Sequence, residues 1–332
     1  MLIYAGIDEA GYGPKFGPMT IGLSVLAIKE APSAMDFLER PLNLWELLKK
    51  VVCRDLKSAR SGRLAVNDSK KLKTPSAGVK HIERSLLSFM RCSGIEIGGL
   101  DRLMADLGSG IPQDLPAWYA PTAEKPWDIL PKGITLAELS IDGAVLGKEL
   151  SLCGVKPMDF RAAIVFEKQF NQMVSKTHSK ASTSFTFVSR HLDYVWQRYG
   201  HLKPFVAVDR QSGRTRYRDL LAFCFAQSRV DVYEETPRRS AYCIKSADGR
   251  REMVVSFEVG SEEIHMPVAL GSMLSKYLRE MLMYRFQAYF LEKLPRVKPC
   301  AGYGADAKRF WAELEPHLDE LNIAINAIRR IS

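Results

Sequence analysis

The sequence has few residues that bind transition metals or form disulfide bonds. Its 332 residues include six cysteines and six histidines, which are widely scattered. No two cysteines stand in the C-x-x-C spacing of a zinc or redox site, and no two histidines stand in H-x-x-x-H spacing. These absences disfavour a zinc site and predict reduced thiols.

Long apolar runs are absent as well. No run approaches the roughly 20 residues that cross a membrane as a helix. The chain enters an apolar strand directly at Leu2, without the basic segment and apolar core of a secretory signal. We therefore expect a cytoplasmic monomer without membrane association.

Basic residues are in excess: 47 Lys and Arg face 38 Asp and Glu, a formal net charge of +9. Such a balance favours a polyanionic partner, although net charge informs about association and not about fold. The length allows roughly two domains, or one domain with insertions.

Two adjacent carboxylates end the first apolar run. Residues Leu2–Ile7 are followed by Asp8 and Glu9, then by a glycine- and proline-rich stretch, 11–18, and a second apolar run, 19–28. This pattern predicts a strand, a tight turn and a second strand. Ionised carboxylates at the end of a buried strand need a cation or a positive partner. Taken alone, the pair is equally compatible with a solvated turn.

Acids recur where later strands end. Asp209 ends the run Phe205–Val208, and Glu262 and Glu263 follow a predicted strand at 253–259. A mixed sheet can bring such strand ends together. Carboxylates without histidine or cysteine companions favour Mg²⁺ or Mn²⁺. Basic side chains that suit phosphates accompany them: Lys70, Lys71, Arg210 and Arg214.

The remaining chain alternates predicted helices and strands. Residues 140–165 read as strand material, residues 93–139 as a loop-rich insertion packed on its own domain, and residues 231–258 as containing a hairpin with an Asp-Gly turn. Helical patterns cover 34–52, 75–90, 179–199, 217–227, 268–291 and two segments after Gly304.

Five segments, in order along the chain, resemble the motifs of type 2 ribonuclease H, the family of ribonucleases HII and HIII. They are GIDEAGYGPKFGP at 6–18, NDSKKL at 67–72, FVAVD at 205–209, VALGSMLSKYLRE at 268–280 and Gly302-Tyr303-Gly304. The resemblance frames nearly the whole chain, and the sequence reads as a divergent member.

The resemblance implies an α/β fold, a ribonuclease H-like mixed five-stranded sheet flanked by helices. It implies a catalytic domain at 1–292, with the insertion at about 93–139 and an extra hairpin at about 231–258. A helical C-terminal addition at 293–332 follows.

The resemblance also implies a metal-dependent endonuclease. Such an enzyme hydrolyses the RNA strand of RNA/DNA hybrids, or cuts 5′ to ribonucleotides embedded in DNA, with Mg²⁺ or Mn²⁺. The implied catalytic acids and metal ligands are Asp8, Glu9, Asp209 and Glu262, with Glu263 as the alternative fourth ligand. The implied substrate-binding residues are Gly11, Tyr12, Gly13, Lys70, Lys71, Arg210 and Tyr303.

Two departures from the family pattern leave alternatives open. Tyr12 stands where the family has arginine between the glycines, and Arg210 follows Asp209 in place of glycine. Loss of a guanidinium removes a bidentate phosphate contact. The alternatives are a catalytically altered nucleic-acid-binding protein of the same fold, and a nuclease with another substrate, such as structured DNA.

Overall fold

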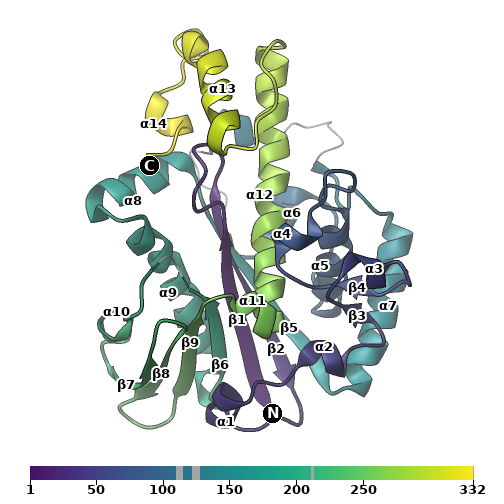
Figure 1. The fold of residues 1–332 in the computed structure, drawn as a ribbon, viewed down its shortest axis with the longest axis vertical. Coiled ribbons are helices and arrows are strands. Elements are labelled where there is room, and N and C mark those ends of the chain that lie inside the picture. Colours follow the sequence, from purple (N-terminus) through teal and green to yellow (C-terminus); the bar gives the residue numbers. More distant parts are fainter. Residues whose placement is uncertain (110–114, 122–127, 211–212, 332) are drawn as a thin grey trace.

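A mixed seven-stranded sheet forms the centre of the molecule (Figure 1). The computed structural model describes residues 1–109, 115–121, 128–210 and 213–331. The strand order is β5-β2-β1-β6-β9-β8-β7. The strands are β1 (Leu2–Ala10), β2 (Met19–Ile28), β5 (Val155–Val165), β6 (Phe205–Asp209), β7 (Ser228–Glu235), β8 (Arg239–Ser246) and β9 (Glu252–Glu258).

Five of these strands form the mixed sheet expected from the sequence. β1, β2 and β5 are antiparallel neighbours, and β6 and β9 run parallel to β1. The predicted strand number was too low because β8 and β7 continue the sheet beyond β9. The prediction also assigned the strands of residues 231–258 wrongly between the five-stranded sheet and the extra hairpin. Its Asp-Gly turn does join two strands, but the second of them, β9, belongs to the five, and only β7 and β8 are additional.

Helices cover both faces of the sheet and its ends. Before β5 lie α1 (Ala34–Glu39), α2 (Leu44–Leu47), α3 (Leu56–Ala59), α4 (Ser69–Leu72), α5 (Lys80–Cys92), α6 (Leu100–Asp106), η1 (Ala117–Tyr119) and α7 (Leu136–Leu152), with a small second sheet of β3 (Val52–Cys53) and β4 (Leu64–Ala65). After β5 come α8 (Glu167–Thr177), α9 (Lys180–Tyr199), η3 (Gly200–Leu202), α10 (Arg218–Cys224), α11 (Ser261–Ile264), α12 (Met266–Lys293), α13 (Gly304–Leu314), η4 (Glu315–His317) and α14 (Ile325–Ile328).

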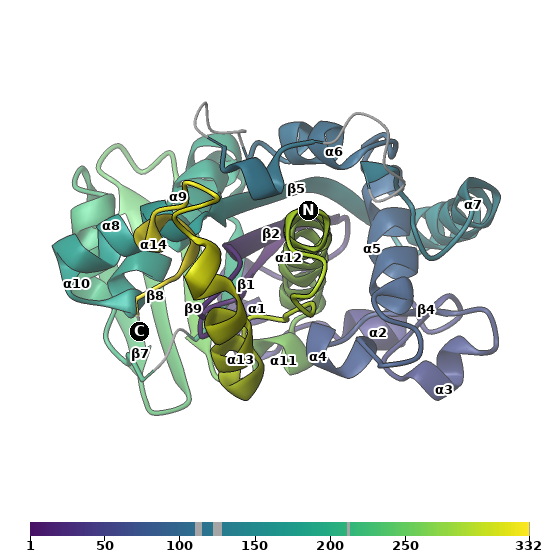
Figure 2. The same ribbon diagram turned by 90° about the horizontal axis from the view of Figure 1, so that it is seen from above.

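The long helix α12 lies directly on β1 and β2. Figure 2 shows it end-on, between these strands and α5. Glycines permit this close approach: a Cβ on Gly6 would stand 2.1 Å from the backbone nitrogen of Val268. Side chains also bond the layers, since Thr20 donates to the Ser275 carbonyl at 2.7 Å and Ser275 donates to the Asp8 carbonyl at 2.8 Å.

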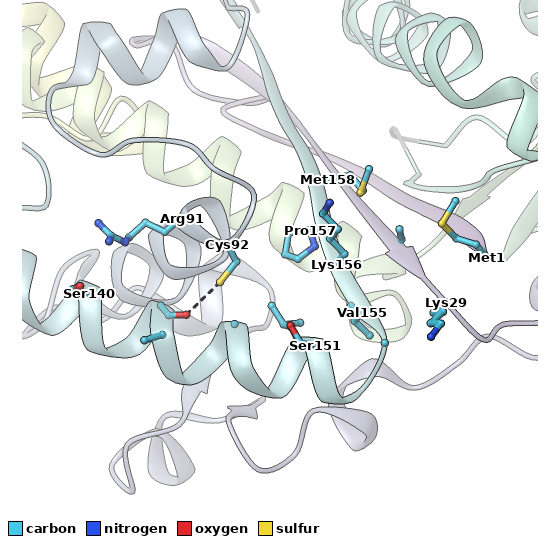
Figure 3. A pocket seen from close by; sticks show the side chains of 16 residues that line it. Met1, Lys29, Arg91, Cys92, Ser140, Ser151, Val155, Lys156, Pro157 and Met158 are labelled. Atoms are coloured by element: carbon cyan, nitrogen blue, oxygen red, sulfur yellow. Dashed lines mark hydrogen bonds between the residues drawn. The ribbon is translucent and has the colours of Figure 1, made fainter.

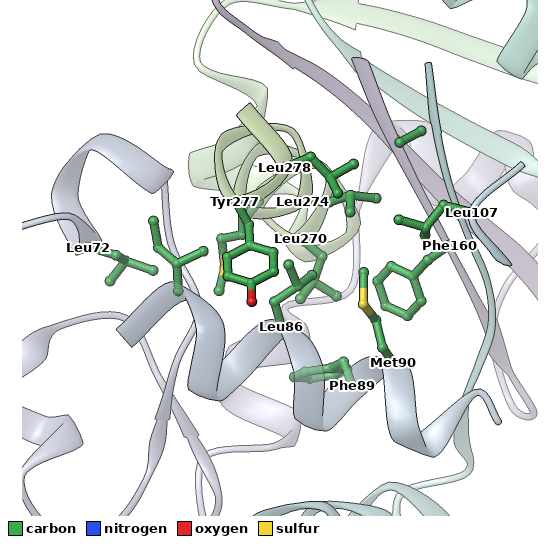
Figure 4. Close-up of a cluster of buried hydrophobic side chains, with 14 of the residues drawn as sticks. Leu72, Leu86, Phe89, Met90, Leu107, Phe160, Leu270, Leu274, Tyr277 and Leu278 are labelled. Carbon is green, nitrogen blue, oxygen red and sulfur yellow. The ribbon is translucent and has the colours of Figure 1, made fainter. Parts of the chain in front are cut away.

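Apolar side chains fill the space between α12, α5 and β5 (Figure 4). Burial of such side chains is the main stabilising contribution to a core. The opposite face of the sheet packs on α9, through Phe185, Val188, Leu192 and Val195. The core members drawn in Figure 4 include Leu72, Leu86, Phe89, Met90, Leu107, Phe160, Leu270, Leu274, Tyr277 and Leu278.

The strand predicted for 140–165 is wrong in its first half, where the structure has α7. Thr135 caps this helix by accepting from the Glu138 backbone N–H, and the Glu138 carboxylate accepts from the Thr135 N–H in return. This capping box is a readable sequence signal. The apolar content of 140–152 favours either a strand or a helix, and the cap decides for a helix.

The described part of the 93–139 insertion packs on α12. Trp118 and Tyr119 are buried, and Arg285 of α12 binds Asp101, Asp128 and the Tyr119 carbonyl. Residues 110–114 and 122–127 of this predicted insertion lie outside the described residues. Within the ranges that the structure describes, no helix is both long and apolar enough to cross a membrane.

Candidate active site at the ends of parallel strands

Asp8 and Asp209 lie side by side on one face of the sheet. Parallel pairing runs from Tyr4 opposite Phe205 to Ile7 opposite Val208, so the next pair in register is Asp8 and Asp209. Neighbouring strands are about 4.8 Å apart, and side chains alternate faces. Asp8 therefore shares its face with Tyr4, beneath α12, where Ser272 donates a hydrogen bond to it.

Glu9 is placed differently from the expectation. β1 continues through Ala10, so Asp8 and Glu9 are both inside the strand. By alternation, Glu9 projects from the face opposite to Asp8. Its backbone N–H donates to the Asp8 carboxylate at 2.6 Å, and its charge acts on Asp8. Glu9 is thus a charged neighbour of Asp8, and its role as a metal ligand stays a prediction.

The short helix α11 brings Glu262 to the same place. The Ser261 backbone N–H donates to Asp209 Oδ1 at 3.2 Å, and Glu262 hydrogen-bonds with the Asp209 carboxyl group. The Oε2 atom of Glu262 is buried without a hydrogen-bond partner. Glu263 is turned away and pairs with Lys71 at 2.6 Å. Of the two acids that the sequence left as alternatives, Glu262 is the one beside Asp8 and Asp209.

These acids perturb one another strongly. Burial, with the charges of Glu9 and Glu262, raises the pKa of Asp8 to about 8. Burial, with the charges of Asp8 and Glu262, raises the pKa of Asp209 to about 8. Like charges held together in a desolvated place favour the protonated form. The cluster therefore has a deficit of positive charge.

Lys70 is a basic residue whose charge interacts with these acids. The segment NDSKKL forms α4, with Asp68 accepting from the Lys70 backbone N–H and Ser69 hydrogen-bonded to Ser272 at 3.1 Å. Partial burial lowers the pKa of Lys70, but the surrounding acids outweigh this effect and raise it. Those acids are Asp68, Asp8, Glu262 and Asp209. Lys70 is exposed, and the charges of Asp8, Glu262 and Asp209 act on its ammonium group.

The chemistry of the cluster suits a hard cation. Its donors are carboxylate oxygens, which Mg²⁺ and Mn²⁺ prefer, and one of them is the partnerless Glu262 Oε2. Within the described ranges, however, no three His, Cys, Asp or Glu side chains are close enough together to hold an ion as they stand. The strand register nevertheless holds the backbones of Asp8 and Asp209 side by side.

The glycine-rich loop after β1 is anchored by hydrogen bonds from arginine side chains. Gly11 has φ +82°, a conformation that favours glycine. The buried guanidinium of Arg330 donates to the carbonyls of Gly11 and Tyr12, and Arg279 donates to the Phe16 carbonyl at 2.9 Å. Gly13 is exposed, with nothing within 4 Å of a Cβ placed on it. The loop is therefore open to solvent at Gly13.

Other predicted substrate-binding residues have mixed placements. Tyr303 is 42% exposed and lies 5.2 Å from the Arg279 guanidinium, beside the glycine loop. Tyr12 packs its ring on the core cluster behind the sheet. Arg210 is directed away from the acids and donates to the carbonyls of Thr236 and Pro237.

Sequence reasoning missed a buried polar chain beside the acids. Glu258 stands opposite Asp209 in the sheet, and its Oε1 lies 3.2 Å from His265 Nε2, while His265 Nδ1 lies 2.6 Å from the Tyr4 hydroxyl. Partial burial opposes ionisation, but the bonds and charge of His265 and the Ser256 hydroxyl lower the pKa of Glu258. The signal was present, because Glu258 ends β9 as Asp209 ends β6.

Solved structures of ribonucleases HII and HIII are among those similar to this chain. Ribonuclease HII of Archaeoglobus fulgidus, solved in a complex with PCNA, is 14% identical, with a TM-score of 0.41 over 99% of this chain and 94% of that one. Ribonuclease H2 of Pyrococcus horikoshii is 16% identical, with a TM-score of 0.43 over 98% and 92%. Bst-RNase HIII in complex with Mn²⁺ is 11% identical, with a TM-score of 0.45 over 99% and 66%.

At these identities and TM-scores, the likeness concerns the fold and assigns no residue roles. No protein-family model and no curated protein matches the sequence.

A cavity of about 850 Å³ lies elsewhere, between α5, α7 and β5 (Figure 3). Arg91, Cys92, Ser151 and Pro157 are among its lining residues, and none of the carboxylates described above lines it. The candidate site is therefore the open end of the sheet and not this cavity.

Proposed function

We propose that the chain is a metal-dependent endonuclease that acts on RNA/DNA hybrids or on ribonucleotides embedded in DNA. The observation that carries the proposal is the gathering of Asp8 of β1, Asp209 of the parallel strand β6 and Glu262 of α11, whose charges act on the exposed Lys70. The ordered motif resemblance to type 2 ribonuclease H supports the choice of substrate.

In this proposal the acids hold Mg²⁺ or Mn²⁺. Asp8, Glu9, Asp209 and Glu262 are the proposed ligands. A bound divalent cation supplies an activated water and stabilises the leaving oxygen of a phosphodiester. Cleavage leaves 5′-phosphate and 3′-hydroxyl ends.

Chain residues around the acids position the substrate. The Lys70 ammonium binds a phosphate next to the cleaved bond, since Lys is a compact cation with three donors. The exposed Gly13 lets the nucleic-acid backbone approach the loop, whereas the buried Gly11 lies against Pro18 and Arg279. The exposed Tyr303 ring packs on a sugar. Lys71 and Arg210, which already have protein partners, contribute less than the sequence indicated.

A nucleic-acid-binding protein without catalysis is the second candidate. Two observations favour it: within the described ranges no three potential ligands stand at coordinating distance, and Tyr12 replaces the expected arginine.

Three labelled duplexes separate the two candidates: an RNA/DNA hybrid, a DNA duplex with one ribonucleotide, and plain DNA. Each is incubated with Mg²⁺ and with Mn²⁺, using the Asp209→Asn protein as the matched control. We expect cleavage of at least one ribonucleotide-containing duplex by the wild type only. Tight binding of these duplexes without any cleavage overturns the enzyme proposal in favour of the second candidate.

A further inference from the structure

A basic pocket lies between α8 and the C-terminal segment 325–331. Its volume is about 1010 Å³. Figure 1 shows the C-terminus and α14 beside α8, and these two helices are in contact. No acidic side chain is among its lining residues, whereas five cations are: Lys15, Lys168, Lys176, Arg329 and Arg330.

The wall of this pocket is fixed by a buried side chain. Asn171 of α8 is only 6% exposed. Its amide donates to the carbonyls of Asn326 and Arg329, at 2.9 and 2.8 Å, and its oxygen accepts from the Ile331 N–H at 2.8 Å. The C-terminal segment is therefore tied to α8 by three hydrogen bonds from one residue.

The cations are held close together. Arg329 stacks on the Trp311 ring, with its guanidinium carbon 4.4 Å from the ring centroid, which limits its movement. Burial, followed by the charges of Arg330 and Lys15, lowers the pKa of the neighbouring Lys180. No Asp or Glu is among the described residues that line the pocket, although the buried Glu167 attracts Arg330. Such a local excess of positive charge attracts anions.

Lys15 connects this pocket to the candidate active site. It belongs to the glycine-rich loop, its N–H donates to the Gly302 carbonyl at 2.8 Å, and its carbonyl accepts from the Arg330 N–H at 2.8 Å. Lys15 stands seven positions after Asp8, so their Cα atoms lie within roughly 25 Å, the span of a fully extended chain. A distance of roughly 25 Å corresponds to about seven base pairs of a nucleic-acid duplex, at 3.4 Å each.

We infer that this pocket binds backbone phosphates of a nucleic-acid duplex that extends from the acidic cluster past the glycine-rich loop. The inference rests on the proposed function for its substrate class. Phosphodiesters are the ligand because several separate monovalent cations, set around an open pocket, match a row of single negative charges better than one compact anion. The pocket contributes affinity and orientation, not sequence recognition.

The test measures binding apart from cleavage. Fluorescence anisotropy with a labelled RNA/DNA hybrid is followed from 50 to 300 mM salt, with Asp209→Asn as the parent protein. Lys168→Gln, Lys176→Gln and Arg329→Gln are introduced singly. We expect each to weaken binding about 3- to 10-fold and to reduce the slope of log affinity against log salt by about one.

Lys148→Gln is the matched control. Lys148 is an exposed lysine on α7, and both ribbon views place α7 on the opposite side of the molecule from α8. Asn171→Ala is the second type of variant, since it loosens the wall and keeps every charge. We expect it to weaken binding as well, with thermal unfolding confirming that the protein is folded.

Duplex geometry supplies a further readout. DNA duplexes with one ribonucleotide carry 3 base pairs on one side and 15 on the other, in both orientations. The effect of Lys176→Gln should appear only with the long flank on one side. Binding indistinguishable from that of Lys148→Gln in both orientations and at every salt concentration overturns the inference.

Inorganic phosphate is titrated as a separate probe. If it binds in the pocket while the three variants leave duplex binding unchanged, the pocket is a small-anion site and the inference fails. Failure of the proposed function looks different: the wild type cleaves nothing, yet the variants still weaken duplex binding. Conversely, if the wild type cleaves normally while the pocket variants bind the duplex as tightly as the parent protein, the nuclease proposal stands and the pocket inference fails.

Discussion

At the scale of single residues, Asp8 and Asp209 destabilise the metal-free fold but provide candidate metal ligands. Asp8 and Asp209 stand next to each other in a desolvated place. The charge of Asp8 raises the pKa of Asp209, and the charge of Glu262 raises the pKa of both. Replacing one with a neutral side chain should stabilise the metal-free protein while abolishing metal binding. Perturbed carboxyl groups at a strand end are therefore better explained by function than by folding.

The Asp209→Asn substitution tests this at several pH values. The pKa of Asp209 is about 8 in the folded state, above its ordinary value near 4. The folded protein thus holds the proton more tightly, so its stability falls as pH rises from about 4 to about 8 and is lower above that. We expect the variant to exceed the wild type in unfolding free energy by at least about 1.4 kcal/mol at pH 9, one pKa unit, and by little at pH 4. Metal-free urea unfolding at both pH values measures this, and a difference independent of pH would contradict it.

Glu262 and Glu263 are adjacent in sequence but differ in surroundings. Glu262→Gln should reduce cleavage by 100-fold or more, since it removes a carboxylate beside Asp209. Glu263→Gln should change cleavage less than about threefold, because it breaks only an exposed ion pair with Lys71. Steady-state cleavage of the preferred duplex compares them, with circular dichroism to confirm folding. Equal losses would show that the register assigned to α11 is wrong.

At the scale of elements, the contact of α12 with β1 sets the site. This helix supplies Ser272 to Asp8 and to Ser69 of α4, so the position of α12 aligns the strand acids with Lys70. The approach depends on small residues at the crossing, among them Gly6 and Gly271. A side chain there pushes the two elements apart.

Gly6→Ala should therefore destabilise the protein severely. Its new methyl group would stand 2.1 Å from the Val268 nitrogen, and the neighbouring atoms are backbone, which cannot rotate away. Overpacking of this kind costs about 3 kcal/mol or more. Thermal unfolding measures the change. The control is Gly98→Ala, where nothing lies within 4 Å of the added carbon, and a Gly6→Ala protein as stable as this control would disprove the close packing.

At the scale of the whole molecule, charge is distributed unevenly. The chain carries a net charge of +9, yet the open end of the sheet gathers carboxylates, while a cationic pocket flanks the glycine-rich loop. A divalent cation at the acids would relieve the repulsion and let a polyanion approach. Binding of metal should therefore be linked to folding stability.

Added Mg²⁺ or Mn²⁺ should raise the melting temperature of the wild type. A ligand at 100 times its Kd stabilises the folded state by about 2.7 kcal/mol. The Asp8→Asn and Asp209→Asn proteins should show a much smaller increase, because each lacks one proposed ligand. Differential scanning fluorimetry at millimolar metal compares the three proteins. An equal increase in all of them would place the bound metal elsewhere.

The sequence by itself determined the parts that depend on local pattern. Apolar runs ending in acids predicted β1 and β6, and the resemblance of five ordered motifs predicted the five-stranded arrangement. The same reasoning failed for 140–152, where apolar content fits both a strand and a helix, and it missed the strand β7. Local pattern does not reveal which edge a hairpin extends.

Only the tertiary structure decided which acids share one place. The parallel register of β1 and β6 pairs Asp8 with Asp209. The short helix α11 places Glu262 beside Asp209, while Glu263 pairs with Lys71. These outcomes depend on strand pairing, side-chain direction and contacts between residues more than 50 positions apart in sequence. Such long-range geometry is set by packing of the whole chain and leaves no mark in the spacing of the residues themselves.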